Sequence, residues 1–211
     1  MLPPLPETGD LQRLQRRRKH ILWGMLGLAL LALLFTSSAW WPSAKVVHKT
    51  IEWIGIALIF VCIFGRTWCT LYIGGRKKRE LVAFGPYSVC RNPLYAFATL
   101  GTFGVGAQSG SLMVASVIAA ATFAVFYNVT KHEEAFLAET FGAEYARYAE
   151  RVPAFLPRLK GWTDAQALMV TPHLVLRTFL DATLFLLAIP ASEVIEQLQR
   201  HGHLPILLRL P

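Results

Sequence analysis

Charged residues and cysteines are both scarce in this sequence. Only 16% of its 211 residues are charged and 54% are hydrophobic, whereas about a quarter of the residues in a soluble domain are charged. This composition excludes an ordinary soluble domain. The three cysteines, Cys62, Cys69 and Cys90, have spacings that match neither a disulfide framework nor a zinc site. We therefore expect no bound metal, packing roles for Cys62 and Cys69 on one helix face, and either a packing or a thiol role for Cys90.

Acidic residues are fewer than basic ones, 13 Asp and Glu against 21 Lys and Arg, which leaves a net charge of +8. The excess is concentrated in two clusters, Arg13–Lys19 and Arg76–Arg79. Basic clusters beside apolar runs are typical of cytoplasmic segments and attract anionic lipids. No nucleic-acid recognition module accompanies them, so we expect no nucleic-acid partner. The N-terminus and the segment after residue 73 are both predicted to be cytoplasmic, in a bacterial inner membrane or its equivalent.

Long apolar runs are what the sequence does have. They are continuous rather than alternating, which excludes barrel strands and leaves helices to satisfy the backbone in lipid. We expect an all-α, polytopic membrane protein of about five transmembrane helices with a small cytoplasmic portion. The expected spans are 21–41, 51–73, a hairpin of two shorter helices over 94–130 with its tip at 109–111, and 170–191. A signal peptide is the alternative for the first run.

Four parts follow from this pattern. They are a basic N-terminus, two transmembrane helices, a core of loop, hairpin and amphipathic water-facing helix (132–150), and a C-terminal extension with an interfacial tail (193–211); their bounds are 1–20, 21–73, 74–160 and 161–211. Arg66 lies well inside the second span, where a charge is costly, so it either snorkels or belongs to a site. Arg177 and Asp181 are four residues apart and can pair on a helix face.

Small residues are expected to bring the two arms of the hairpin together. Glycines recur in the first arm and small side chains in the second, which allows close approach of two backbones in a membrane. These residues are Gly101, Gly104 and Gly106 in the first arm and Ala115, Ser116, Ala119 and Ala120 in the second.

Polar and aromatic motifs flank this hairpin on both sides. Before it come Gly85-Pro86-Tyr87 and Arg91-Asn92-Pro93-Leu94-Tyr95. After it come His132-Glu133-Glu134, Phe141-Gly142, Tyr145, Tyr148, Val152-Pro153 and Pro157. Because a hairpin returns the chain to the membrane face from which it started, the two sets are predicted to meet there, on the cytoplasmic side.

In order and spacing, these motifs resemble the isoprenylcysteine carboxyl methyltransferase and phospholipid methyltransferase family of integral membrane enzymes. The resemblance covers about residues 81–160. It implies that 74–160 is a catalytic core, that the cytoplasmic portion binds a cofactor, and that this cofactor is S-adenosylmethionine. Glu133 aligns with the glutamate that binds the cofactor, and the other implied contacts are Leu81, Val82, Tyr87, Asn92, Pro93, Leu94 and Tyr95. Glu133 suits the ammonium of the cofactor, and the face of Tyr95 suits its sulfonium.

Catalytic roles are expected for Arg91, Arg151 and Glu134, with Arg91 or Arg151 orienting the acceptor or the cofactor carboxylate. Two positions depart from the family pattern. Asn92 replaces the usual histidine and cannot titrate, so it is not a general base. Val129 stands where the isoprenylcysteine enzymes carry a substrate-side arginine, so a carboxylate acceptor would need another cation, such as Arg66, Arg91, Arg151 or Lys131.

The function expected from this resemblance is methyl transfer from S-adenosylmethionine to a lipophilic or membrane-associated acceptor. Transfer would be an in-line displacement, in which the enzyme aligns and desolvates the nucleophile, in a cavity at the cytoplasmic membrane face. Prenylcysteine, phospholipid amine and small thiol acceptors all remain open. Two other classes compete with this reading: an NADPH-dependent enzyme like the sterol reductases, and a non-enzymatic membrane scaffold or transporter.

Overall fold

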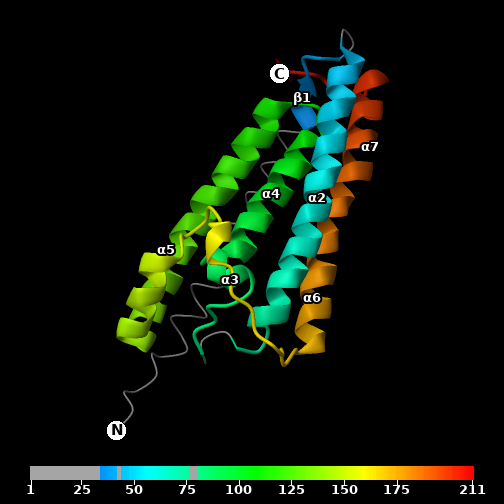
Figure 1. Cartoon of the computed structure of the whole chain (residues 1–211). Coiled ribbons are helices and arrows are strands. Elements are labelled where there is room, and N and C mark those ends of the chain that lie inside the picture. Colours follow the sequence, from blue (N-terminus) through cyan, green and yellow to red (C-terminus); the bar gives the residue numbers. More distant parts are fainter. Residues whose placement is uncertain (1–33, 42–43, 77–79) are drawn as a thin grey trace, which may run out of the picture.

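The computed structural model describes residues 34–41, 44–76 and 80–211 (Figure 1). These residues are mostly helical, which confirms the all-α membrane class. Among them, three stretches are long and apolar enough to cross a membrane: Lys45–Ile73, Leu112–Arg151 and Pro172–Arg200. Most of the expected first span and the whole basic N-terminus lie outside the described residues. The total of five spans therefore stays a prediction.

In chain order the elements are β1 (Thr36–Ser38), α2 (Lys45–Ile73), α3 (Pro86–Val89), α4 (Pro93–Ala107), α5 (Leu112–Arg151), the 3-10 turn η1 (Leu159–Gly161), α6 (Pro172–Thr183), the 3-10 turn η2 (Leu184–Leu187), α7 (Ala188–Arg200) and β2 (Leu208–Leu210). Helix α4 has 15 residues and is about 22 Å long at 1.5 Å per residue. It is therefore shorter than a hydrocarbon core of about 30 Å.

Helices α2 and α4 touch backbone to backbone. A Cβ atom built on Gly104 would lie 2.5 Å from the carbonyl oxygen of Gly55, and one on Gly101 would lie 2.5 Å from Cys62 Sγ. Gly106 is the one of the three α4 glycines that faces α5, where a Cβ would lie 2.6 Å from Ala115 Cα. The expectation that all three serve the hairpin was wrong, because α4 is packed between two helices and uses different glycines for each.

The hairpin tip lies where it was expected, between α4 and α5. Ser111 caps α5, since its Oγ accepts a hydrogen bond of 3.2 Å from the amide of Val114. The expected break near residue 131 is wrong, because α5 continues through it. The helix is interrupted at Gly142 instead, where φ is 50° and ψ is −125°. The last part of α5 is folded back beside the part that precedes it (Figure 1).

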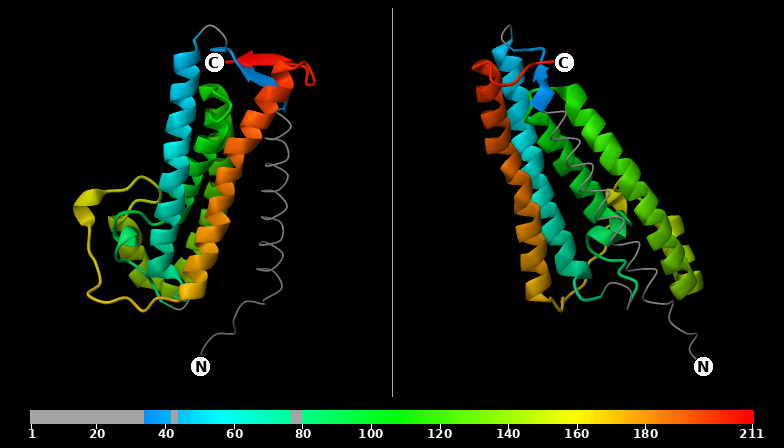
Figure 2. Two further views of the ribbon diagram at one scale, coloured as in Figure 1. Left: turned by 90° about the vertical axis from the view of Figure 1, so that its right-hand side faces the viewer. Right: turned by 180° about the vertical axis from the view of Figure 1, so that it is seen from behind.

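The C-terminal region, expected to be a span ending at 191 followed by an amphipathic interfacial tail, consists of two helices and a short strand. Helices α6 and α7 follow one another through η2 as a single path beside α2 (Figures 1 and 2), so the helical stretch runs to Arg200 rather than ending at 191. Strand β2 then pairs in parallel with β1, with Thr36 opposite Leu208 and Ser38 opposite Leu210. On α6, Arg177 Nε and Asp181 Oδ2 lie 4.0 Å apart, as the spacing predicted.

The fold has two distinct ends. The end of α2, all of α3, the start of α4 and the lower part of α5 lie at one end, which is the lower end in Figure 1. The two strands, the hairpin tip and the C-terminus lie at the other end (Figures 1 and 2). The two sets of motifs therefore share one end of the bundle.

Candidate active site

The first motif forms a tight turn into a short helix. Gly85 has a φ of 59°, and a Cβ there would lie 2.1 Å from the ring of Tyr72, so glycine is required by both conformation and space. Pro86 then starts α3, whose N-terminal turn is closed by a 2.7 Å hydrogen bond from Ser88 Oγ to the carbonyl of Gly85. This turn buries Tyr87.

The second motif is tied to the segment that follows α5. The amide of Arg91 donates to the carbonyl of Pro153 at 2.8 Å, and the amide of Asn92 donates to that of Ala154 at 3.1 Å. The hydroxyl of Tyr148 donates to the carbonyl of Tyr87 at 2.8 Å. The hairpin thus brings the two halves together, through two backbone hydrogen bonds and one from a side chain, as predicted.

Glu134 lies between the side chains of Arg91 and Asn92. Arg91 Nε and Glu134 Oε1 are 3.1 Å apart, and Asn92 Nδ2 donates to the same oxygen at 3.0 Å. Arg91 also donates through Nη1 to the carbonyl of Ala149 at 2.9 Å. Both members of the ion pair are largely buried, with side-chain exposures of 16% for Arg91 and 24% for Glu134. The pair therefore fastens the motif loop to α5.

Glu133 points to a different partner from that of its neighbour. Its Oε1 accepts a 3.1 Å hydrogen bond from the hydroxyl of Tyr95. Tyr95 is buried on α4, and its ring centroid lies 4.9 Å from that of Phe126 on α5. A carboxylate beside an aromatic ring is a suitable environment for a cationic ligand.

The remaining residues implied by the resemblance form apolar walls. Val82 is buried in a cluster with Cys69, Tyr72 and Tyr87, and Leu94 packs against it. Leu81 packs against a second cluster formed by Tyr145, Tyr148 and Val152. Pro93 is buried at the first turn of α4.

Two buried hydroxyls of this region have no hydrogen-bond partner among the described residues. They belong to Tyr87 and Tyr145. Burial raises the pKa of the Tyr87 hydroxyl well above its usual value, so it stays a neutral donor. Because an unpaired buried hydroxyl is costly, these two groups indicate a place for a polar ligand.

Arg151 is not brought into the cluster. It is exposed at the end of α5, and its Nε donates to the carbonyl of Arg147 at 3.2 Å. Val129 packs beside Tyr95 and Phe126, so an apolar side chain occupies the position of the family's substrate-side arginine. Lys131 is also exposed, and its Nζ lies 5.2 Å from the ring centroid of Tyr127.

Residues beyond 160 contribute to the same end of the fold, which the motif spacing did not indicate. The hydroxyl of Tyr72 donates to Asp164 Oδ2 at 3.2 Å. Trp162 stacks on Trp68 with 5.6 Å between ring centroids. In the sequence, only Trp162-Thr163-Asp164 could have indicated this contribution. It lies after Pro157, the last proline of the motif, and is not part of the motif pattern.

Cys90 packs against the segment after α5. Its Sγ donates to the carbonyl of Phe155 at 3.3 Å. Burial raises the pKa of the Cys90 thiol to about 11, so less than about one thiol in a hundred is ionised at neutral pH. This environment supports the packing role over the thiol role.

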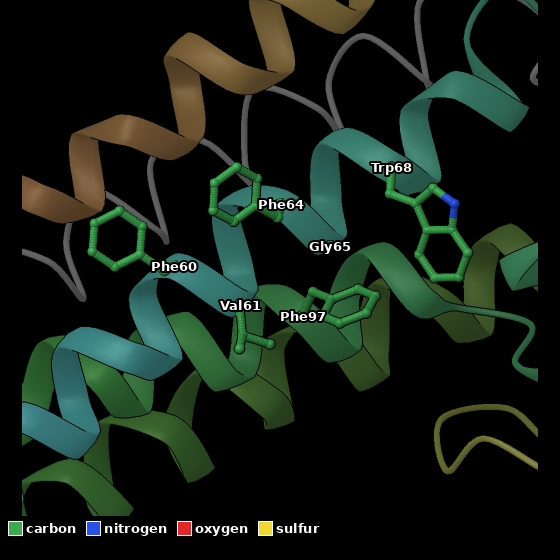
Figure 3. Close-up of a pocket in the computed structure, with 6 residues that line it drawn as sticks. All are labelled: Phe60, Val61, Phe64, Gly65, Trp68 and Phe97. Carbon is green, nitrogen blue, oxygen red and sulfur yellow. The ribbon is translucent and has the colours of Figure 1, made fainter.

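An apolar hollow of about 450 Å³ opens on the side of the bundle. Figure 3 shows the side chains around it, which come from α2 except for Phe97 of α4; the lining residues are Phe60, Val61, Phe64, Gly65, Trp68 and Phe97. Phe97 also packs against the cluster of Cys69, Tyr72, Val82 and Tyr87. Through Phe97, the hollow therefore adjoins one wall of the candidate site. Arg66, next to Gly65 on α2, is partly buried.

Sequence comparisons place these observations among known proteins. The model of a family described as phospholipid methyltransferase matches residues 52–144. The cobalt-zinc-cadmium resistance protein CzcN of Cupriavidus metallidurans is 39% identical over 176 residues, which are 82% of this chain and 79% of that protein. The nickel-cobalt-cadmium resistance protein NccN of Alcaligenes xylosoxydans is 34% identical over 99% of this chain and 97% of its own length.

A more distant relative carries an enzyme name. The protein-S-isoprenylcysteine O-methyltransferase of Rattus norvegicus is 28% identical over 134 residues, which are 57% of this chain and 46% of that protein. No solved structure gives a significant match.

Proposed function

Because this chain belongs to the isoprenylcysteine and phospholipid methyltransferase family of integral membrane proteins, we propose that it transfers a methyl group from S-adenosylmethionine to a lipophilic acceptor. The observation that carries the proposal is the pairing of Glu133 with Tyr95, beside the ion pair of Glu134 with Arg91. Glu134 holds the loop in place, and Glu133, the residue before it on α5, accepts from the hydroxyl of Tyr95.

The residues fit the proposed cofactor. S-adenosylmethionine carries an ammonium, a carboxylate and a sulfonium, and when bound it supplies a methyl group already activated for in-line displacement. Glu133 would hold the ammonium, and the face of Tyr95 would lie beside the sulfonium. The unpaired hydroxyls of Tyr87 and Tyr145 supply donors for its polar groups. Leu81, Val82, Asn92, Pro93 and Leu94 would form the surrounding wall.

The residues of the chain mainly align and desolvate the reactants. Arg91 and Asn92 keep Glu134 in place, and so hold the turn of α5 that carries Glu133. Asn92 cannot take a proton, so the acceptor must arrive as a nucleophile or lose its proton elsewhere. Arg151 is directed away from this cluster, which leaves Arg91 as the better supported positioning arginine.

The acceptor that these surroundings favour is lipophilic and lacks a carboxylate. Val129 provides no charge at the substrate-side position, and Arg91 is paired with Glu134. The apolar hollow between Phe64, Trp68 and Phe97 (Figure 3) would admit such an acceptor laterally from the membrane. An amine or thiol on an apolar carrier fits better than a prenylcysteine carboxylate.

Cofactor binding can be tested on the detergent-purified protein by isothermal titration calorimetry. We expect S-adenosylmethionine to bind the wild type and the Glu139→Ala variant, whose substituted residue is exposed on the same helix. Binding should weaken at least tenfold in Glu133→Ala, because the ammonium loses its partner. Equal affinity in all three proteins would contradict the assigned site, and binding of NADPH instead would favour the reductase class.

The names of the two metal-resistance relatives suggest a setting for this reaction. Both relatives match most of the chain, so we infer that its methyl transfer serves cells exposed to divalent metals. A strain that depends on this gene for growth in cobalt or zinc should be rescued by the wild type and by Glu139→Ala but not by Glu133→Ala. Rescue by Glu133→Ala would separate metal resistance from methyl transfer.

A further inference from the structure

A second polar cluster lies at the end of the fold opposite the candidate active site. It consists of His48 and Glu52, one turn apart on α2, and Glu196 on α7. His48 Nε2 lies 2.9 Å from Glu52 Oε1 and 3.0 Å from Glu196 Oε1. His48 is 2% exposed, and the side chains of Glu52 and Glu196 are 14% and 19% exposed. Two carboxylates therefore converge on one nitrogen of a buried imidazole.

The neighbouring residues hold this cluster in place. Lys49 pairs with the outer oxygen of Glu52, and Arg200 Nη2 lies 2.7 Å from the outer oxygen of Glu196. The ring of His48 lies against Gly110 of the hairpin tip, where a Cβ would come within 1.9 Å of Nδ1. The imidazole thus has little room to turn, and its Nε2 stays directed at the two carboxylates.

Hydrogen bonds alone cannot pair all the polar atoms of His48, Glu52 and Glu196. An imidazole Nε2 carries at most one hydrogen, which two carboxylate oxygens would have to share. The other ring nitrogen, Nδ1, is buried and has no hydrogen-bond partner among the described residues. A cation between the three groups would use the lone pair of Nε2 and neutralise both carboxylates.

We propose that His48, Glu52 and Glu196 bind a borderline divalent cation such as Co²⁺ or Zn²⁺. One imidazole nitrogen and two carboxylate oxygens form a donor set that these ions prefer. With bonds of about 2.1 Å, adjacent donors lie about 3.0 Å apart in an octahedral site and about 3.4 Å apart in a tetrahedral one. Nε2 lies 2.9 Å from Glu52 Oε1 and 3.0 Å from Glu196 Oε1, which matches the octahedral spacing. Three protein ligands leave the remaining positions for water. The flanking cations, Lys49 and Arg200, moderate the affinity by opposing a further positive charge.

This site escapes sequence analysis because its ligands are distant in the chain. Glu196 is 148 residues from His48, and the three residues match no motif of metal ligands. The pairing of α7 with the start of α2 creates the site. A bound ion would therefore join the C-terminal helix to the transmembrane core, near the point where Gln199 Nε2 donates to the carbonyls of Leu34 and Thr36.

Titration of the purified, EDTA-treated and desalted protein with Co²⁺ tests the proposal. We expect one Co²⁺ per chain, visible absorption bands from the coordinated ion, and a raised unfolding temperature. Affinity should fall at least tenfold in Glu196→Gln and in His48→Asn. The Co²⁺ affinity should stay unchanged in Glu193→Gln, an exposed position on the same helix, and in His203→Asn, which tests the stacked rings of His201 and His203 as alternative ligands.

Two results would overturn the metal site. One is the failure of the wild-type protein to bind Co²⁺ or Zn²⁺, which would leave the cluster as an ion-pair network between α2 and α7. The other is equal Co²⁺ affinity in the wild type and Glu196→Gln. Neither result depends on methyl transfer, because the site shares no residue with the candidate active site, and S-adenosylmethionine binding by the same samples reports that function separately.

Discussion

At the residue scale, adjacent carboxylates of α5 take different partners. Glu133 meets the hydroxyl of Tyr95, and Glu134 meets Arg91 and Asn92. The motifs predicted that these residues would be neighbours, because a hairpin returns the chain to its starting face. They could not predict that Arg151 bends toward Arg147, because the direction of a long side chain at a helix end depends on packing that spacing does not encode.

Removing the carboxylate of Glu134 should loosen the motif loop. Glu134→Ala leaves the partly buried Arg91 without its ion pair, and hydrogen bonds to charged groups contribute about 1.5–3 kcal/mol. We expect a loss of about 2 kcal/mol in the free energy of unfolding, measured in detergent by circular dichroism. Glu150→Ala, at an exposed position of the same helix, is the control. A loss no larger than that of the control would show that the pair does not stabilise the loop.

At the element scale, the reversal at Gly142 shapes the candidate site. The sequence predicted an amphipathic, water-facing helix over 132–150, and two motif residues within it, Tyr145 and Tyr148, are buried in one cluster. The expected start of that helix near 132 was wrong because apolar periodicity does not report where two helices join. A glycine with a φ of 50° marks the junction, and the Phe141-Gly142 pair is the sequence signal for it.

Substituting Gly142 should lower the free energy of unfolding through backbone conformation alone. A Cβ at Gly142 would meet no atom within 4 Å, so Gly142→Ala creates no clash. The positive φ is nonetheless unfavourable for alanine by about 1–3 kcal/mol. Gly161→Ala is the matched control, since its Cβ would make only an ordinary 3.6 Å contact with the carbonyl of Ser88. Equal unfolding free energies for the two variants would contradict a structural requirement for glycine at 142.

At the scale of the whole molecule, the two ends of the bundle carry different chemistry. The motif end holds the candidate active site, and the other end holds the two strands and the cluster of His48, Glu52 and Glu196. The all-α membrane class followed from composition, and the site followed from the motifs. The β1–β2 pairing and the metal ligands could not be predicted, because both depend on contacts between residues far apart in the chain.

The orientation of the molecule in the membrane stays a prediction. If the motif end is cytoplasmic, the C-terminus lies on the opposite side, because the two are at opposite ends of the bundle (Figure 1). Alkaline phosphatase, which folds only outside the cytoplasm, should then be active when fused after residue 211. An inactive but stably expressed fusion would reverse the predicted orientation.

Ultraviolet crosslinking of radiolabelled S-adenosylmethionine to the purified protein tests whether the paired motifs form its binding site. We expect covalent labelling that excess unlabelled S-adenosylmethionine prevents and excess NADPH does not. The labelled peptides should come from 81–95 or 126–148, the two segments that the hairpin brings together. A label confined to other segments, or no displaceable label at all, would contradict the claim that these paired motifs form an S-adenosylmethionine site.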